Sequence, residues 1–439
     1  MPENSESLVH VCVIGSGPAG YYAAETLAKE PHVRVDVIDK LPTPYGLIRG
    51  GVAPDHQSIK GVYRRYEKTA LGDTVRFVGN IEVGKDITLA ELREIYDAVV
   101  LATGAPKDRE LGIPGDDKKG VVGSAAFVGW YNSHPEFADL NPDLNVMSVA
   151  VIGNGNVAVD VVRVLAKTPE EMAESDLALY AAKEIQKSPI TDIWMLGRRG
   201  SLEAKFTPKE MGELNELTNC VAVTAPEDLP TLSDEELAEL KPATKKNMGH
   251  LYEVAKNKPG ENKKTLHIKF YAMPVEILGD ETVSGIRLEK TIVDDSGKCI
   301  GTGETFDIDC QMVVPCIGYR SIAIEGAEFN EDWGLYVNDE GVIEDGLYVT
   351  GWARRGPTGT IGTNRTDAQE VAAKVLENEK GSNKPGRAGL DEVIAARNLQ
   401  VVTFNDWKKI EAAEAAAATG AQPRVKFHKV EDMLKATKS

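Results

Sequence analysis

Two segments of this chain each join an apolar run, a glycine-rich turn and a helix-like continuation, and this pair constrains the fold more than any other feature. The first is HVCVIGSGPAG at 10–20, and the second is SVAVIGNGNVA at 148–158. A strand that turns through such glycines into a helix is typical of a dinucleotide-binding βαβ unit. Two such units predict two dinucleotides, and therefore electron transfer between them.

The first turn has three glycines with separate roles. Gly15 permits the tight turn, Gly17 lets the backbone approach a pyrophosphate, and Gly20 lets the helix pack against the strand. The next alternating run ends in Asp39, about 20 residues beyond the glycines, where a carboxylate accepts hydrogen bonds from ribose hydroxyls. With strand, helix and acid in register, we favour a nucleotide site over a purely structural turn. The position in the first βαβ unit favours FAD.

The second turn differs at its third position, where Ala158 replaces glycine. This replacement is commoner in sites that accept the larger NADP phosphate. The following strand-like run, 191–200, ends in Arg198 and Arg199, where the first unit has an acid. Two guanidinium groups there would bind a 2′-phosphate. The alternative is a solvent-exposed basic turn, but after this glycine-rich turn we favour NADPH.

Three further apolar runs, at 96–105, 310–319 and 346–352, predict buried strands that complete the two units. A second glycine-rich segment, 354–362, leads into a predicted helix at 367–379, and a helix N-terminus of this kind can face a flavin ring or its phosphate. The polar stretch 221–264 is expected to be a surface excursion.

Length and composition limit the number of domains and the classes of partner that this protein can have. A chain of 439 residues predicts two or three domains, and a formal charge of −18 disfavours nucleic acid and anionic membranes as partners. No apolar run approaches the length of a membrane span. Five cysteines without a C-x-x-C pair suggest a reduced compartment and no metal site. The polar N-terminal residues 1–7 lack signal or transit character, so we expect a cytoplasmic protein.

Longer motifs carry a family resemblance. They are PYGLIRGGVAPDH at 44–56, FVGWYN at 127–132, GNGNVA at 153–158, GRRG at 197–200 and the segment 351–362. Together they resemble the adrenodoxin-reductase-like ferredoxin–NADP(+) reductases, over about residues 9–434. The resemblance implies an α/β fold of two Rossmann-like, glutathione-reductase-like dinucleotide-binding domains, with the NADPH domain inserted into the FAD domain. We expect the FAD domain at 1–107 and 320–439 and the NADPH domain at 108–319.

The resemblance also implies the cofactor contacts, to which the motif glycines are added. For FAD these are Gly15, Gly17, Ala19, Gly20, Asp39, Leu47, Ile87, Trp352, Gly359, Thr360 and Ile361. For NADP(H) they are Arg109, Asn154, Gly155, Asn156, Val157, Arg198, Arg199 and Glu210.

Two titratable residues, His56 and Glu210, are expected near the nicotinamide, where they position it or handle a proton. Each has a structural alternative. His56 follows Asp55 and could simply start a helix, and Glu210 could be a first-turn acid that stabilises a helix N-terminus. The sequence leaves both alternatives open.

No closely spaced cysteine pair could carry electrons away from the flavin, since Cys12 lies inside the first strand. We therefore expect a flavoprotein that passes a hydride from NADPH to FAD and then single electrons to a ferredoxin-type iron–sulfur protein, reversibly in principle. The alternatives are an NADPH diaphorase or oxidase that reduces quinone or oxygen, and a redox sensor.

An acidic ferredoxin would need a basic docking patch on this acidic chain. Candidates are Arg198, Lys205 and Lys209, with Arg354, Arg355, Lys245 and Lys246 as others. We expect a monomer or weak dimer.

Overall fold

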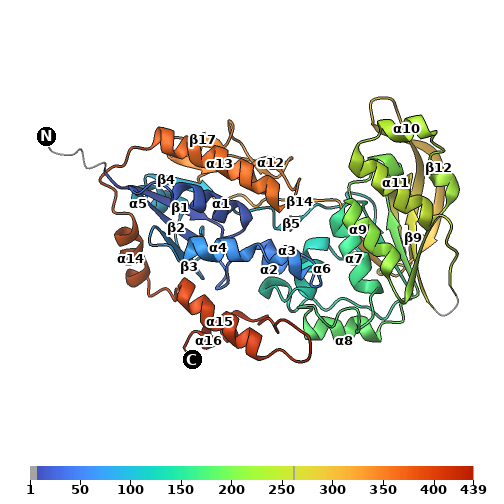
Figure 1. Ribbon diagram of the computed structural model, residues 1–439, viewed down its shortest axis with the longest axis horizontal. Coiled ribbons are helices and arrows are strands. Elements are labelled where there is room, and N and C mark those ends of the chain that lie inside the picture. Colours follow the sequence, from blue (N-terminus) through green and yellow to red (C-terminus); the bar gives the residue numbers. More distant parts are fainter. Residues whose placement is uncertain (1–6, 261–262, 439) are drawn as a thin grey trace. The chain divides into compact units, whose positions relative to one another are not determined.

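The computed structural model describes residues 7–260 and 263–438 and divides the chain into two compact units (Figure 1). Unit 1 contains the chain up to Lys107, the segment Asn132–Ala138 and the chain from Gly318 onward. Unit 2 contains Asp108–Tyr131 and Asp139–Ile317. The chain thus leaves unit 1 after Lys107 and returns to it for good at Gly318. The brief return at Asn132–Ala138 had no signal in the sequence.

Unit 1 is built on a six-stranded sheet of order β17-β18-β4-β1-β2-β3. Five strands run parallel and β17 is antiparallel to β18. The strands are β1 (Val9–Ile14), β2 (Val33–Asp39), β3 (Val75–Gly79), β4 (Ala98–Leu101), β17 (Val342–Glu344) and β18 (Leu347–Val349). The runs at 96–105 and 346–352 therefore form the short strands β4 and β18.

Side chains alternate across β1 and build a core on each face of this sheet. Val11 and Val13 face a cluster completed by α1 (Pro18–Leu27) and α13 (Ile361–Asn378), which lie side by side in Figure 1. Cys12 and Ile14 face the opposite cluster, which includes α5 (Leu89–Ile95) and α14 (Arg387–Ala396). The sheet therefore lies between two helical layers, with the glycine-rich turn at the carboxyl end of its central strand.

A third apolar cluster joins α1 to the C-terminal helices through Tyr45, Tyr66 and Trp407. The C-terminal helices are α15 (Phe404–Ala416), which contains most of the alanine-rich run, and α16 (Val430–Ala436). The remaining elements of unit 1 are α2 (Leu47–Gly50), α3 (Gln57–Lys60), α4 (Tyr63–Ala70), α12 (Trp352–Arg355), β14 (Tyr319–Arg320), β15 (Phe329–Asn330), β16 (Leu335–Tyr336) and η1 (Pro135–Phe137). The chain crosses into unit 2 within β5 (Lys107–Asp108).

Unit 2 has a parallel five-stranded sheet of order β13-β6-β7-β9-β8 and an antiparallel sheet of order β10-β11-β12. The parallel strands are β6 (Ser148–Ile152), β7 (Asp192–Leu196), β8 (Cys220–Thr224), β9 (Lys264–Lys269) and β13 (Met312–Pro315). The antiparallel strands are β10 (Ala272–Leu278), β11 (Gly285–Val293) and β12 (Cys299–Asp309). Ile286 and Leu288 of β11 share a core cluster with Ala150 and Ile152 of β6, so the two sheets pack together.

The helices of unit 2 are α6 (Ser124–Tyr131), α7 (Asn156–Ala166), α8 (Leu179–Lys187), α9 (Pro208–Glu213), α10 (Asp234–Glu239) and α11 (Pro242–Val254), with the short turns η2 (Ser201–Glu203), η3 (Leu214–Glu216) and η4 (Pro226–Asp228). The stretch 221–264, expected as a surface excursion, contains α10 and α11. It is more than an excursion, because β8 at its start and β9 at its end belong to the parallel sheet. β8 lies at the edge of this sheet, and its residues alternate between buried and half-buried.

Within the described ranges, no helix combines the length and apolarity needed to cross a bilayer. Nor do three His, Cys, Asp or Glu side chains of this part of the chain gather into a possible metal site. All five cysteines are free thiols. Residues 1–6, on which the expectation of a cytoplasmic location partly rests, lie outside the described residues.

Candidate functional site

The first glycine-rich turn leaves no room for side chains at two of its glycines. Gly15 has φ +108°, and a Cβ there would lie 2.4 Å from the Ala102 carbonyl oxygen. A Cβ on Gly20 would lie 1.9 Å from the Gly15 carbonyl oxygen, so α1 packs directly on the turn. Gly17 caps α1 without a side-chain hydrogen bond, and the main-chain N–H groups of the first turn therefore remain available to a phosphate.

A second loop lies along this turn. The Tyr45 main-chain N–H donates to the Ser16 carbonyl at 3.0 Å, and a Cβ on Gly46 would lie 3.0 Å from the Gly17 Cα. The next residue, Leu47, is 43% exposed although it is apolar. A flat apolar ligand held by the turn could cover such a side chain.

Asp39 ends β2, and its carboxylate is oriented by the first turn. One oxygen, Oδ2, accepts hydrogen bonds from the main chain (2.9 Å) and hydroxyl (2.5 Å) of Ser16, and Oδ1 accepts one from Leu41 N–H at 2.9 Å. Burial raises the pKa of Asp39, while the bonds from Ser16 and Leu41 lower it. A carboxylate offers about four acceptor positions, so one remains for a ribose hydroxyl. The sequence reasoning missed Ser16, although a small hydroxyl between two glycines is a usable signal.

The C-terminal glycine-rich segment meets α1. A Cβ on Gly351 would lie 2.5 Å from the Ala19 Cβ. The half-buried Trp352 donates its indole N–H to the Thr358 carbonyl at 3.2 Å. Gly359 and Thr360 are exposed and lead into the 18-residue helix α13, whose N-terminal end carries positive helix-dipole charge. These residues therefore place an aromatic side chain beside a helix N-terminus, at which Thr360 and Thr363 form a capping box.

Arg354 and Arg355, two of the docking candidates, hold this segment in place. Arg354 forms a 2.5 Å ion pair with the buried carboxylate of Asp367, which also accepts a hydrogen bond from Gly351 N–H. Arg355 donates to the Asn364 side chain at 2.7 Å and to the Thr358 carbonyl. Their charges are largely neutralised locally, which weakens both as docking residues.

Two further unit 1 candidates are buried. Ile87 is 0% exposed in an apolar cluster with Ile38, so its side chain is committed to the core and only its main chain could reach FAD. His56 is 6% exposed and stands at the N-cap position of α3, but its imidazole makes no capping hydrogen bond. The position of His56 agrees with the alternative that it starts a helix, but its side chain does not cap that helix.

The second glycine-rich turn repeats the geometry of the first. Gly153 has φ +136°, and a Cβ there would lie 2.4 Å from the Cys316 carbonyl oxygen. At Gly155, by contrast, no described protein atom outside its two chain neighbours lies within 4 Å of an added Cβ. Ala158 is fully buried where the first turn has glycine. Gly155 therefore borders space that a ligand could enter.

The loop after β7 is bonded to this turn. The Asn154 carbonyl accepts hydrogen bonds from the main-chain N–H of Lys205 (2.8 Å) and Phe206 (3.0 Å). The Asn156 side chain accepts one from Thr207 N–H at 2.8 Å. A Cβ on Gly197 would overlap the Asn154 side chain, 1.7 Å away. The two segments predicted to bind NADP(H) thus form one assembly.

Arg198 and Arg199 leave the end of β7 on this loop. Arg198 is exposed and Arg199 is half-buried. In the part of the chain that the structure describes, neither guanidinium joins an ion pair, and the buried Arg199 Nε has no hydrogen-bond partner. Two guanidinium groups without ion pairs on one turn suit a dianionic group such as a phosphate.

Glu210 lies in the first turn of α9 and is 7% exposed. Its Oε2 is buried and has no hydrogen-bond partner among the described residues. The position fits a first-turn acid, but such an acid is ordinarily solvated. Arg109, half-buried, follows Asp108, whose carboxylate caps α6 through Ala125 N–H at 2.8 Å. The other docking candidates of unit 2 are the exposed Lys205, Lys209, Lys245 and Lys246.

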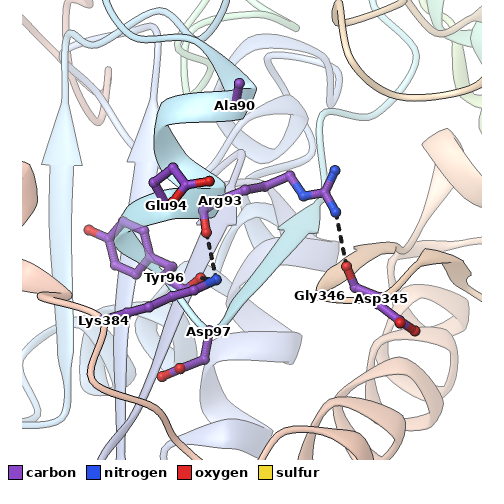
Figure 2. Close-up of a pocket in the computed structure, with 8 residues that line it drawn as sticks. All are labelled: Ala90, Arg93, Glu94, Tyr96, Asp97, Asp345, Gly346 and Lys384. Carbon is purple, nitrogen blue, oxygen red and sulfur yellow. Dashed lines mark hydrogen bonds between the residues drawn. The ribbon is translucent and has the colours of Figure 1, made fainter.

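A hollow of about 370 Å³ in unit 1 lies away from these residues (Figure 2). Asp97 and Gly346 line it just before β4 and β18, at the amino end of the sheet, whereas nucleotides bind at the carboxyl end. Lys384 Nζ donates to the carbonyls of Arg93 (2.6 Å) and Tyr96 (2.9 Å). The basic group is thus already satisfied, and the hollow is not a candidate nucleotide site.

Every residue expected to contact FAD lies in unit 1, and every residue expected to contact NADP(H) lies in unit 2. His56 belongs to unit 1 and Glu210 to unit 2.

Comparison with known proteins gives close matches. The family model described as pyridine nucleotide-disulphide oxidoreductase matches residues 9–174. The chain is 38% identical to a mitochondrial NADPH:adrenodoxin oxidoreductase of Arabidopsis thaliana, covering 98% of this chain and 95% of that protein. It is 38% identical to the NADPH-ferredoxin reductase FprA of Mycobacterium leprae, covering 97% of this chain and 98% of that protein. The solved structure of Mycobacterium tuberculosis FprA in complex with NADPH superimposes with a TM-score of 0.94, at 37% identity over 98% of this chain and 100% of that one.

Proposed function

The chain belongs to the family of NADPH:adrenodoxin oxidoreductases and NADPH-ferredoxin reductases, and from this premise we propose how its residues divide the work of the enzyme. Its resemblance and its fold of two dinucleotide units, expected from the motifs, are confirmed. The chain is a flavoprotein NADPH:ferredoxin oxidoreductase with FAD and NADP(H) as cofactors and an iron–sulfur protein as acceptor. The observation that carries this conclusion is the match along nearly the whole chain.

Unit 1 fits a bound flavin nucleotide. The close approach of Gly46 to Gly17 forms a cradle that a Cβ would fill, and the start of α13 adds the positive end of a helix dipole. When bound, FAD supplies the step between a two-electron hydride donor and a one-electron acceptor. In our proposal Gly15, Gly17 and Gly20 admit the pyrophosphate, with Ala19 at the start of α1, and Asp39 binds a ribose.

The remaining unit 1 contacts complete the flavin site. Leu47 and Trp352 cover apolar surface of the nucleotide, and the main chain of Gly359, Thr360 and Ile361 binds polar atoms. Ile87 contributes through its main chain only.

Unit 2 binds NADP(H) in this proposal. The main chain at Asn154, Gly155, Asn156 and Val157 approaches the pyrophosphate at the start of α7. The guanidinium groups of Arg198 and Arg199 bind the 2′-phosphate, which NADH lacks, and Arg109 adds a further cation.

His56 and Glu210 position the nicotinamide in our proposal. Both side chains are buried, and burial away from solvent keeps water from competing for a hydrogen bond. Glu210, with one carboxylate oxygen unbonded among the described residues, can accept a hydrogen bond from a carboxamide. If either residue also transfers a proton, its replacement by Gln should change the pH dependence of kcat.

For the acceptor we propose an acidic ferredoxin that docks on four of the exposed lysines of unit 2, namely Lys205, Lys209, Lys245 and Lys246. Because the chain carries a net charge of −18, an acidic partner needs positive side chains at its docking surface, and these four lysines are exposed to solvent. Lys209 also lies 3.8 Å from Glu213. We further propose that the protein acts in the cytoplasm as a monomer or weak dimer, without nucleic acid as a partner.

A kinetic comparison of NADPH and NADH tests the assignment. We expect Arg198→Ala with Arg199→Ala to raise the KM for NADPH at least tenfold and to leave the KM for NADH nearly unchanged, because only NADPH carries the 2′-phosphate. Replacing the exposed Lys183 and Lys187 of α8 by Ala removes the same charge from unit 2 and should change neither value.

Equal effects of the two Arg replacements on NADPH and NADH would show a structural role instead. The acceptor is tested by cytochrome c reduction with and without added ferredoxin. A rate that does not depend on ferredoxin would favour a diaphorase.

A further inference from the structure

The turn that carries Arg198 is held by the antiparallel sheet of unit 2. Three successive carbonyls of the turn, at 197–199, all accept hydrogen bonds. Ala272 N–H donates to the Gly197 carbonyl at 2.9 Å, and Tyr271 N–H donates to the Arg199 carbonyl at 3.1 Å. Both donors are main-chain groups at the start of β10, and no substitution with another L-residue except proline removes them.

The middle carbonyl, that of Arg198, is held differently. The Thr291 hydroxyl donates to it at 2.7 Å, and the Cys299 thiol lies 2.9 Å away. Both partners are side chains of the antiparallel sheet, Thr291 from β11 and Cys299 from β12. This is the point at which a side-chain change alone can loosen the turn. A hydroxyl is the stronger donor of the two, since a thiol donates weakly.

Thr291 is itself held in place. It is 5% exposed, and its N–H donates to the Tyr271 carbonyl at 3.1 Å. The register between β11 and β12 shifts between Glu289 and Thr291, so Thr291 lies next to an irregularity that re-aims the strand. Its position is therefore set by the sheet and not by the turn that it contacts.

The Arg198 side chain lacks comparable support. It is exposed, and within the described ranges no carboxylate pairs with it. The Arg198 carbonyl belongs to the peptide that joins Arg198 to Arg199, so a hydrogen bond to it fixes the directions in which the two arginine side chains leave the turn relative to each other. Bidentate binding of a phosphate requires a guanidinium held close to one geometry.

We propose that Thr291 is a positioning residue for NADPH selectivity: its hydroxyl fixes the Arg198 carbonyl and thereby presets the guanidinium for the 2′-phosphate. This inference rests on the proposed function of Arg198. It assigns a role in cofactor selection to the antiparallel sheet, which contributes no residue to the glycine-rich turn.

Thr291→Val tests the proposal because valine keeps the size and branching of threonine and removes only the donor. The direct probe is adenosine 2′,5′-bisphosphate, with 5′-AMP as the ligand without the 2′-phosphate, both titrated into the FAD-loaded protein by calorimetry. We expect Thr291→Val to weaken the bisphosphate about five- to tenfold, as for loss of one hydrogen bond, and to leave 5′-AMP unchanged. The KM for NADPH should rise by a similar factor, with kcat and the KM for NADH unchanged.

Thr291→Ser, which restores the hydroxyl, should return the bisphosphate affinity to within about twofold of the original. Equal weakening of bisphosphate and 5′-AMP by Thr291→Val would overturn the proposal, because it would indicate a general disturbance of unit 2. If Thr291→Val prevents folding, Thr291→Ala removes the same hydroxyl donor with a smaller side chain. Its affinities for the bisphosphate and 5′-AMP are then compared in the same way.

Arg198→Ala, measured in parallel, separates this inference from the assignment on which it rests. If Arg198→Ala weakens the bisphosphate and Thr291→Val does not, the positioning role is wrong and the phosphate site stands. If Arg198→Ala has no effect on the bisphosphate, the assignment of the phosphate site is wrong, and the role of Thr291 is wrong with it.

Discussion

The ion pair between Arg49 and Glu414 joins the loop that carries Leu47 to the C-terminal helix α15. Arg49 donates from both terminal nitrogens to the two carboxylate oxygens, at 2.8 and 2.5 Å. The Glu414 side chain is 0% exposed and that of Arg49 is 11% exposed. Glu414 also accepts a hydrogen bond from Phe427 N–H at 2.8 Å. The C-terminal segment therefore anchors α2 through this buried, bidentate contact, beside a hydrogen bond from Lys426 Nζ to the Arg49 carbonyl at 3.2 Å.

Replacing Arg49 by Met keeps the aliphatic stem and leaves the Glu414 carboxylate buried without its cation. Breaking a buried pair in this way costs about 3–5 kcal/mol. Because Arg49 lies two residues after Leu47, the loosened loop should also bind FAD more weakly. Glu414→Gln in the same background removes the stranded charge, so the double variant should recover at least about 2 kcal/mol relative to the sum of the single changes.

The assay is urea unfolding of the FAD-loaded protein, followed by flavin release and by circular dichroism. The matched control is Lys85→Met, since the Lys85–Glu82 pair is 75% and 45% exposed and should contribute less than about 1 kcal/mol. A loss below about 1 kcal/mol for Arg49→Met, or strictly additive single and double variants, would refute the reasoning that this contact is a buried clamp.

Two other substitutions test local geometry and pH dependence. Gly155→Ala should leave the unfolding midpoint unchanged, because no described protein atom outside its two chain neighbours lies within 4 Å of the new Cβ, but should raise the KM for NADPH at least tenfold. Gly153→Ala should instead destabilise unit 2 by about 1–3 kcal/mol, because of its φ of +136° and the nearby Cys316 carbonyl; similar behaviour of the two variants would contradict this contrast. Burial lowers the pKa of His134 to about 4 from an ordinary value of 6.5, so its contribution to stability is fully present above about pH 6.5 and is lost as the pH falls towards 4. His134→Gln should therefore reduce the drop in urea midpoint between pH 7 and 4.5, and an unchanged drop would contradict the burial argument.

The glycine-rich turns show what local sequence can predict. The roles of Gly15, Gly20 and Gly153 follow from steric limits that act within a few residues or between neighbouring strands, and the structure has the close contacts that those roles require. The order of strand, turn, helix and acid was likewise readable up to Asp39. The family resemblance, which comparison confirms, rests on the same short motifs.

Other features had little or no local signal. The strands β8 and β9 flank a polar stretch that read as a surface excursion. β8 was hard to recognise because it lies at the sheet edge, where a strand needs few apolar residues. Arg354 and Arg355 read as free cations, whereas the buried Asp367 neutralises much of their charge. A charge in a sequence does not show which opposite charge the fold will bring to it.

By itself, the sequence determined the family and the fold of two dinucleotide-binding units. It also predicted that the first unit binds FAD, that the second binds NADP(H), and that electrons leave without a cysteine pair, and these three points stay predictions. These conclusions depend on backbone sterics and on side-chain chemistry within short segments. The tertiary structure alone decided which distant side chains hold those segments in place. The contacts of Thr291 with Arg198 and of Glu414 with Arg49 join positions 93 and 365 residues apart. Such pairs form only because the packing of sheets and helices brings distant parts of the chain together. That packing depends on the burial of many apolar side chains, each of which contributes little free energy.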